Sequence, residues 1–341
     1  MKQIALDRFG TDEIISLYKD KPVIKVLQGI RRSGKSFMLE LLSRKILESG
    51  AAENQILLLN MEDFENAEFL DSKKLYDFIK SKSEAAGGKK LYLFLDEIQE
   101  ISGWEKLVNS LYSSATIDAD IYITGSNANL LSSELATYLS GRYVLIHVWP
   151  LSYREFLHFN SEIDSAAAFR KFIEFGGFPG LKDMMENPVQ IRSYLEGIYS
   201  TVLLKDVIAR NKIRDTAVLE KIILYIADNT GNIFSAKRIS DFMKSGGRPL
   251  SVETIYNDIK YLENALVLYK VPRYDVRGKK ILETMEKYYL ADQGLLTFLH
   301  GYKDTYINGI LENIVFIELL RRGYKVFIGK IGDAEIDFAA E

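Results

Sequence analysis

The sequence predicts an α/β protein that begins with a parallel sheet covered by helices. Three observations carry this prediction. Short apolar runs alternate with amphipathic segments of helix length up to residue 150. Helical periodicity without strand signals follows up to about residue 214, and helices and strands return together after it. Strands that alternate with helices of this length indicate crossover connections between parallel strands.

Five strands are expected in the first domain, residues 1–150. They are short, apolar and rich in β-branched or aromatic residues, as in a sheet buried on both faces. The predicted strands are 23–27, 56–60, 91–95, 121–124 and 143–148, and the predicted helices between them are 35–48, 72–86, 104–114 and 129–139.

Three further regions follow. Residues 151–214 read as a helical lid or connector, interrupted by a Gly-Gly-Phe-Pro turn at 176–179, because glycine and proline disfavour a helix interior. Residues 215–300 show three amphipathic helices and then strands at 266–271 and 288–290, an order typical of a winged helix-turn-helix. Residues 301–341 read as a helix from 310 followed by strands at 324–328 and 335–338.

Composition limits the functions that remain. The 341 residues are enough for two or three domains with buried cores. A net charge of −3 excludes a polycation, so nucleic-acid binding would need a local basic patch. The absence of cysteine excludes disulfides, a thiol nucleophile and cysteine-based zinc sites, and the three histidines lack metal-ligand spacing.

No apolar stretch approaches the ~20 residues that cross a bilayer, and the N-terminus lacks the pattern of a signal peptide. We therefore expect a cytoplasmic protein with no membrane association. The lack of cysteine is compatible with a reducing compartment.

A phosphate-binding motif follows the first predicted strand. Residues 29–36 read G-I-R-R-S-G-K-S, a complete G-x-x-x-x-G-K-S that opens a predicted helix. The backbone N–H groups of such a loop wrap phosphate oxygens, while Lys35 is expected to reach the β- and γ-phosphates and Ser36 to bind Mg²⁺. Arg31 and Arg32 either touch nucleotide or face solvent. The residues assigned to the nucleotide are Gly29, Ile30, Arg31, Arg32, Ser33, Gly34, Lys35, Ser36 and Phe37.

A pair of acids follows the strand predicted at 91–95. Asp96 is expected at the carboxyl edge of the sheet, where it can hold Mg²⁺ through water, and Glu97 can polarise the attacking water. The alternative is that both acids cap the next helix. The Asp-Glu pair and the absence of an N-K-x-D motif favour ATP over GTP.

Two further catalytic candidates are less specific. Asn127 or Ser126, after the strand at 121–124, can sense the γ-phosphate or position water, or both can cap the following helix. Arg142 is either an arginine finger, acting in its own chain or in a neighbouring subunit, or a structural ion-pair partner.

These motifs together resemble a prokaryotic family of AAA+-type P-loop ATPases related to archaeal and signal-transducing ATPases. Further shared signals are Thr124-Gly125-Ser126, Pro150-Leu151-Ser152, the turn at 176–179 and Asp292. The resemblance implies ATP binding at Gly34, Lys35 and Ser36, Mg²⁺ at Ser36 and Asp96, and hydrolysis by Glu97. It also suggests a homo-oligomer by analogy.

The expected function is an enzyme that hydrolyses ATP with Mg²⁺ and couples its nucleotide state to a nucleic-acid or protein partner. The alternative is a switch that binds ATP, turns over slowly and signals through protein contacts. A basic loop at 270–280 carries a net charge of +4 and could grip phosphates without reading bases. Its candidate contacts are Arg273, Arg277, Lys279 and Lys280, and a protein partner is weighed equally.

The last segment resembles the beginning of a PD-(D/E)xK nuclease. Glu312 and Asp337 match the first two acids of such a site, which share a divalent metal. The acid-x-Lys element that should follow is not present in the sequence, so we expect an incomplete nuclease-like segment without cleavage activity. The alternative is that both acids are ordinary helix and strand residues.

Overall fold

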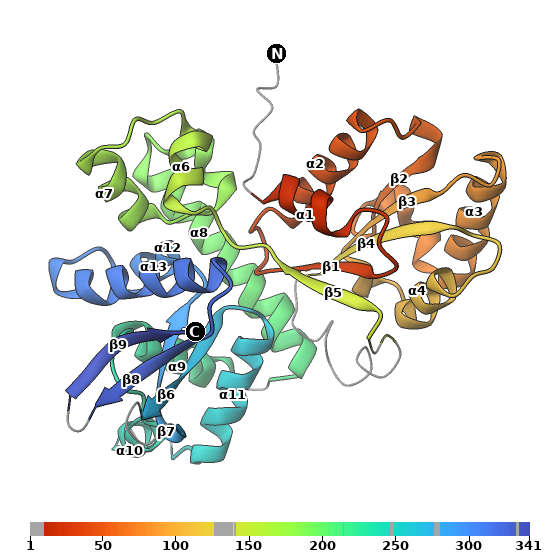
Figure 1. The fold of residues 1–341 in the computed structure, drawn as a ribbon. Helices are drawn as coiled ribbons and strands as arrows, with labels where there is room; N and C mark the ends of the chain where they lie inside the picture. Colours follow the sequence, from red (N-terminus) through yellow and green to blue (C-terminus); the bar gives the residue numbers. More distant parts are fainter. Residues whose placement is uncertain are drawn as a thin grey trace. The chain divides into compact units, whose positions relative to one another are not determined.

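The computed structural model describes residues 10–125, 139, 141–213, 215–245, 249–275, 280–331 and 334–341. Backbone contacts divide the chain into two units (Figure 1). The first comprises Met1–Gly29 and Gly34–Val148, and the second comprises Ile30–Ser33 and Trp149–Glu341. This division lies beside the domain limit expected at residue 150. The finer limits at 214 and 300 stay a prediction.

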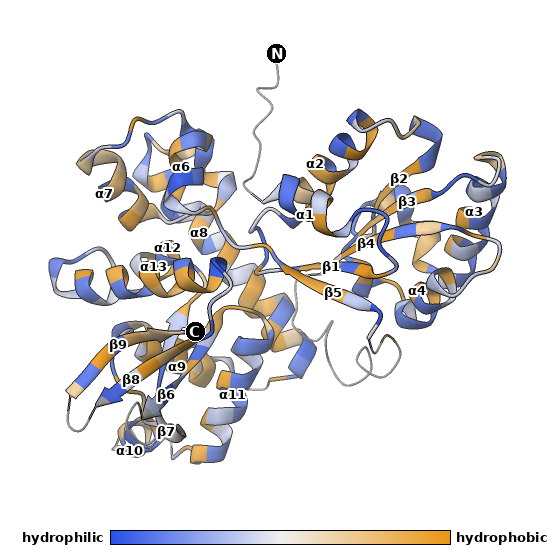
Figure 2. Ribbon diagram, viewed as in Figure 1, coloured by the Kyte–Doolittle hydropathy of each residue, from blue (hydrophilic) through white to orange (hydrophobic). Residues whose placement is uncertain are grey.

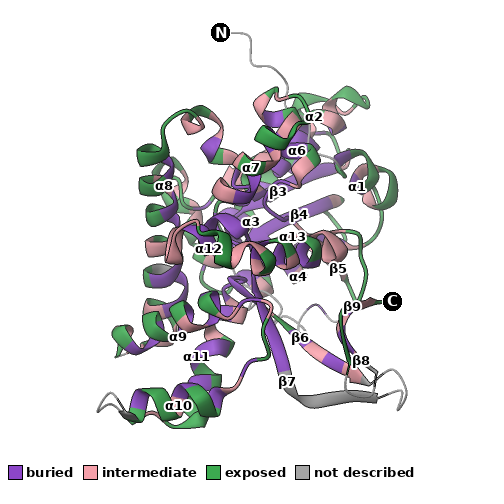
Figure 3. Ribbon diagram, turned by 90° about the vertical axis from the view of Figure 1, so that its left-hand side faces the viewer, coloured by how far each residue is buried: buried purple, intermediate pink, exposed green. Residues whose placement is uncertain are grey.

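The sheet of the first unit has five parallel strands in the order β2-β3-β4-β1-β5. Each observed strand overlaps a predicted one, and β3 and β4 are almost entirely buried (Figure 3). The α/β fold class, with the parallel sheet of a P-loop protein, is therefore confirmed. The strands are β1 (Ile24–Gln28), β2 (Ile56–Asn60), β3 (Leu91–Asp96), β4 (Ala119–Gly125) and β5 (Tyr143–His147).

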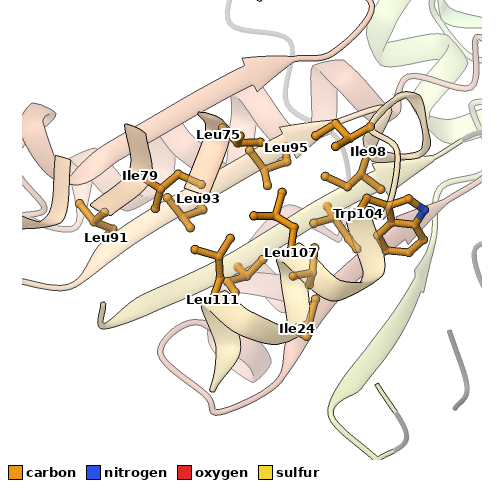
Figure 4. Packing of buried hydrophobic residues seen from close by; sticks show 14 of the residues in the cluster. Ile24, Leu75, Ile79, Leu91, Leu93, Leu95, Ile98, Trp104, Leu107 and Leu111 are labelled. Atoms are coloured by element: carbon orange, nitrogen blue, oxygen red, sulfur yellow. The ribbon is translucent and has the colours of Figure 1, made fainter. Parts of the chain in front are cut away.

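Helices cover both faces of this sheet, because each carries an apolar stripe and a polar one, visible as alternating colours along α2 and α3 (Figure 2). On one face, leucines of β3 meet the apolar side chains of α3 and α4 (Figure 4). On the other, α1 and α2 pack against Phe94 and Tyr122. The helix expected at 129–139 falls mostly outside the described residues. The observed helices are α1 (Thr11–Tyr18), α2 (Lys35–Glu48), α3 (Ser72–Ala85) and α4 (Trp104–Tyr112), with short 3₁₀ turns at Glu53–Gln55, Phe64–Leu70 and Ile98–Glu100.

The second unit begins with helices, as expected. A glycine-rich turn separates the second helix from the third, and Gly176 there has a left-handed φ of 84°. The carboxylate of Asp292 accepts hydrogen bonds from the N–H of Gly177 and of Gly294, each at 2.7 Å. The turn and Asp292 are therefore parts of one structural feature. The elements are α6 (Tyr153–Asn160), α7 (Ala166–Phe175), a 3₁₀ turn (Pro179–Met184), α8 (Pro188–Thr201) and a π-helix (Val202–Ala209).

Three helices and a hairpin follow, in the order that a winged helix predicts. The hairpin strands β6 and β7 are longer than expected, and β6 also pairs in parallel with β8. The terminal strands therefore share one sheet with the hairpin, in the order β7-β6-β8-β9. The winged-helix interpretation stays a prediction. The elements are α9 (Thr216–Asp228), α10 (Ala236–Ser245), α11 (Val252–Asn264), β6 (Leu268–Asp275), β7 (Lys280–Leu290), α12 (Gln293–His300), a 3₁₀ turn (Asp304–Tyr306), α13 (Ile307–Arg321), β8 (Val326–Ile331) and β9 (Ala334–Ala340).

Candidate nucleotide site

The glycine-rich motif forms the loop between β1 and α2. Gly34 caps α2 with a φ of 97°, a left-handed conformation that glycine adopts readily, and Lys35 is the first residue of the helix. Gly34 offers no side chain to cap this helix end, and the N-terminus of a helix presents backbone N–H groups that suit an anion. The Lys35 ammonium donates to the Gly29 carbonyl at 3.1 Å. Backbone donors and a buried lysine thus converge where phosphates are expected.

The middle of this loop differs from a simple solvent-facing turn. Arg31 is buried, and its Nε donates to Oδ2 of buried Asp206 at 3.2 Å, a contact within the second unit. Arg32 is exposed and has a left-handed φ of 67°. Ile30 and Ser33 are buried. Asp206 is therefore a partner of the loop that the sequence analysis missed, while a nucleotide contact by Arg31 or Arg32 stays a prediction.

Asp96 ends β3 next to the start of α2. It is buried, and its carboxylate accepts hydrogen bonds from the Ser36 and Thr124 hydroxyls. Burial raises the pKa of Asp96, the two hydroxyl hydrogen bonds oppose that rise, nearby Glu97 adds to it and Lys35 opposes it. A hydroxyl and a carboxylate side by side, next to the loop where phosphates are expected, suit Mg²⁺, which commonly takes only one or two protein ligands. Ser36 and Asp96 therefore fit the metal role assigned to them.

Glu97 follows directly in a left-handed conformation, with a φ of 51°, uncommon for a residue with a side chain. Its N–H donates to the Thr124 hydroxyl at 3.0 Å, and its Oε1 lies 3.9 Å from Lys35 Nζ. Its Oε2 accepts a hydrogen bond from Gln99 Nε2. The structure thus brings Lys35, Ser36, Asp96 and Glu97 together and adds Thr124 and Gln99, whose side-chain roles the sequence analysis missed. The pairing of β3 with β4 was the signal for Thr124, because parallel strands end at one edge.

Two predicted catalytic residues are not brought to this site. Asn127, like Ser126, lies outside the described residues. Arg142 precedes β5, which runs parallel to β1, whereas the phosphate loop follows the carboxyl end of β1. Its guanidinium donates to Asn109 Oδ1 at 2.6 Å and lies over the Tyr112 ring. Arg142 therefore lies at the amino edge of the sheet, opposite the phosphate loop of the same chain. This corrects the prediction that Arg142 acts as an arginine finger in its own chain, whereas its action in a neighbouring subunit stays a prediction.

Of the four basic residues expected to contact a nucleic acid, Arg273 alone has a described side chain. Arg273 is buried, and its Nη2 lies 3.7 Å from Glu335 Oε2, so it is not exposed to grip a phosphate backbone. This corrects the prediction for Arg273. Lys270 also has a partner, Glu286, at 3.5 Å. Arg277, Lys279 and the side chain of Lys280 lie outside the described residues.

The two acids of the nuclease-like segment also lie among ionic contacts. Glu312 Oε1 accepts hydrogen bonds from Lys287 Nζ at 3.0 Å and from the Tyr289 hydroxyl, and Lys287 also contacts Glu335 at 2.7 Å. Lys287 is a partner that the sequence analysis missed. The described residues contain no group of three or more histidine or acidic side chains arranged to hold a metal. An incomplete nuclease site, or ordinary structural acids, remain as predictions.

Among the helices of the described residues, none is both long and apolar enough to span a bilayer.

Comparisons with known proteins place the chain among its relatives. Residues 21–157 match the family described as "AAA domain", and residues 166–306 match a domain of unknown function, DUF8612. Solved structures similar to the chain include AMPPCP-bound DnaA from Aquifex aeolicus (14% identity, TM-score 0.38, 74% of this chain and 85% of that one). The Aeropyrum pernix ORC1 protein in complex with DNA shows 13% identity and a TM-score of 0.35, over 90% of this chain and 91% of that one.

Two relatives match almost the whole chain. An uncharacterized protein of Haemophilus influenzae is 43% identical over 95% of this chain and 80% of its own length. The uncharacterized protein MJ1544 of Methanocaldococcus jannaschii is 31% identical over 92% of this chain and 71% of its own length. The chain, a P-loop protein with an AAA-type first domain, therefore belongs to the same family as these two uncharacterized proteins.

Proposed function

We propose that this chain binds ATP with Mg²⁺, hydrolyses it, and couples its nucleotide state to a nucleic-acid or protein partner. The observation that carries the proposal is the meeting of Lys35, Ser36, Asp96 and Glu97 at the carboxyl edge of one parallel sheet. These groups supply a phosphate-binding cation, two metal-binding oxygens and a carboxylate that can accept a proton.

The bound Mg²⁺ would supply charge neutralisation on the phosphate oxygens. The chain's own residues supply the rest. The loop N–H groups and Lys35 hold the phosphates. Glu97 accepts a proton from a water molecule while the oxygen of that water attacks the γ-phosphorus. The bond from that phosphorus to the bridging oxygen breaks, which leaves ADP and inorganic phosphate.

The choice of partner depends on residues beyond this site. Since Arg273 is buried and Lys270 is paired, a nucleic-acid contact on the hairpin would rest on Arg277, Lys279 and Lys280. We therefore propose that the partner is either a nucleic acid or a protein, and the experiment below includes DNA to distinguish them.

The test compares two variants with wild type. In Lys35→Ala we expect ATP affinity and turnover both to fall about tenfold or more, because a charge at the phosphates is removed. In Glu97→Gln we expect binding to be kept and turnover to fall by about 10²–10⁴-fold, the usual contribution of a general base. Lys45→Ala is the matched control, since Lys45 is on the same helix and pairs with exposed Asp12. Phosphate release and equilibrium binding of ATP report the two effects.

Full turnover in Lys35→Ala would refute the site. Equal loss of binding and turnover in Glu97→Gln would assign Glu97 a structural role. Turnover near zero in wild type, with ATP binding retained in the presence and absence of DNA, would favour the slow switch, whereas stimulation by DNA would support a nucleic-acid partner.

A further inference from the structure

Gln99 lies beside the proposed general base. It is the second residue of the 3₁₀ turn Ile98–Glu100, which follows Glu97 directly. Ile98 is fully buried in the core of the first unit, and the Glu100 N–H donates to the Glu97 carbonyl at 3.1 Å. The backbone that carries Gln99 is therefore fixed with respect to Glu97.

The hydrogen bond between the two side chains defines the orientation of the amide. Gln99 Nε2 donates to Glu97 Oε2. Because a carboxylate only accepts hydrogen bonds, the amide atom that faces it must be the nitrogen. Gln99 Oε1 then faces away, and it is buried without a hydrogen-bond partner among the described residues. A purely structural amide would be expected to satisfy both of its ends, since a buried polar atom without a partner is costly.

The position of the second Glu97 oxygen follows from this contact. With Oε2 held by Gln99, Oε1 is the oxygen that lies 3.9 Å from Lys35 Nζ, at the phosphate loop. The backbone of the same residue is anchored separately, by its N–H to the Thr124 hydroxyl at 3.0 Å. Gln99 is thus the contact that fixes the side chain, whereas Thr124 fixes the main chain.

We propose that Gln99 is a positioning residue of the ATPase site: its amide N–H holds one oxygen of Glu97 so that the other faces the phosphates. The inference rests on the hydrolysis proposed above. The carboxylate has several rotatable bonds, and an unconstrained one spends part of its time turned away from the reacting water. Holding it in one rotamer raises the rate of the chemical step without adding any contact to the nucleotide.

The principal variant is Gln99→Met, which keeps the length of the side chain and removes its N–H donor. We expect kcat to fall about tenfold or more, because small misplacements of a catalytic group have effects of that size. The Kd of a non-hydrolysable ATP analogue with Mg²⁺ should stay within about twofold of wild type. Gln55→Met is the matched control, since Gln55 is in the same unit and also donates from its amide, to the Lys90 carbonyl at 2.8 Å, at the amino end of β2.

A double-mutant cycle separates positioning from a loss of fold. If Gln99 acts through Glu97, Gln99→Met should lower kcat much less in a Glu97→Gln background than in wild type, because the carboxylate base to be positioned has gone. Thermal unfolding of each variant checks that the first unit is folded.

The outcomes distinguish the two proposals. A wild-type chain without Lys35-dependent hydrolysis would refute the proposed function, and the role of Gln99 would fall with it. A wild-type chain that hydrolyses ATP, with Gln99→Met equally fast, would overturn the role of Gln99 alone. The same holds if Gln99→Met weakens analogue binding as much as turnover, or if its effect is undiminished in the Glu97→Gln background.

Discussion

Replacing Asp292 with asparagine removes a charge that is buried between two glycine N–H groups in the second unit. Oδ2 accepts from Gly177 and Oδ1 from Gly294, each at 2.7 Å. Burial raises the pKa of Asp292 to about 6, although these two hydrogen bonds and the charge of Arg321 oppose the rise. Asparagine keeps the shape of the side chain but does not titrate.

The magnitude follows from proton linkage. The usual pKa of an aspartate is 3.8, so between that value and about 6 the folded chain binds more protons at Asp292 than the unfolded chain does. The stability that Asp292 contributes is therefore greatest below the lower value and is lost as pH rises through the higher one. The two pKa values correspond to a difference of about 3 kcal/mol in the free energy of unfolding.

The assay is urea denaturation of the parent and of Asp292→Asn at about pH 4 and about pH 7. Both chains carry Trp104→Phe, so that the signal comes from Trp149, which packs against Tyr269 in the second unit. From about pH 4 to about pH 7, the free energy of unfolding of the parent should fall by about 2.5 kcal/mol more than that of the variant, because a small part of the difference is already lost at pH 4.

The pH dependence is the decisive quantity. The absolute stability of the variant also changes, because the asparagine amide must turn its NH₂ toward one of the two backbone donors, at a cost of about 1–3 kcal/mol. Parallel pH profiles for the parent and Asp292→Asn would refute the reasoning.

Two further predictions concern packing. Gly177→Ala should lower the free energy of unfolding by about 3 kcal/mol, because the added Cβ would lie 2.3 Å from a backbone carbonyl oxygen. The control Gly197→Ala lies within α8 with open space around its Cβ and should raise the free energy of unfolding by about 0.5–1 kcal/mol. Equal stabilities of the two variants in urea denaturation would contradict this prediction. Asp120→Ala should cost about 3–5 kcal/mol, because the buried Lys25 ammonium, whose pKa burial already lowers, loses its carboxylate partner and is left with the Lys21 carbonyl. Lys25→Met should cost less, since Asp120 keeps a tyrosine hydroxyl and a backbone N–H as donors. Thermal unfolding of the first unit ranks the two, and the reverse order would count against the argument.

Local signals in the sequence were enough for the five strands of the first unit and for α2, α3 and α4, but not for α1, which was not expected. Helix α2 begins and ends at the residues expected, because Gly34 adopts the left-handed conformation that precedes it and Gly50 adopts one shortly after it. Strand β7, by contrast, was expected only over its last three residues. Its buried Glu286 and Lys287 interrupt the apolar pattern, and the partners of Lys287 come from α13 and β9, which the sequence alone does not bring together.

The same contrast holds for the site. Lys35, Ser36, Asp96 and Glu97 were found because each belongs to a motif written within a few consecutive residues. Arg142 was misplaced for its own chain because its position depends on the parallel pairing of β5 with β1. Arg273 was assigned to a surface because its neutralising partner, Glu335, is on a strand far along the chain.

The parallel pairing of β6 with β8 has a consequence for biosynthesis. Strand β6 can join β7 as soon as the hairpin leaves the ribosome, but its other edge, from Arg273 to Asp275, must wait for Ile328 to Lys330. At roughly 5–20 residues per second this wait lasts several seconds. During that time an open strand edge is exposed, and open edges are the surfaces that pair with other chains. The nascent second unit is therefore open to pairing with other chains in the interval between the synthesis of its hairpin and that of its last two strands.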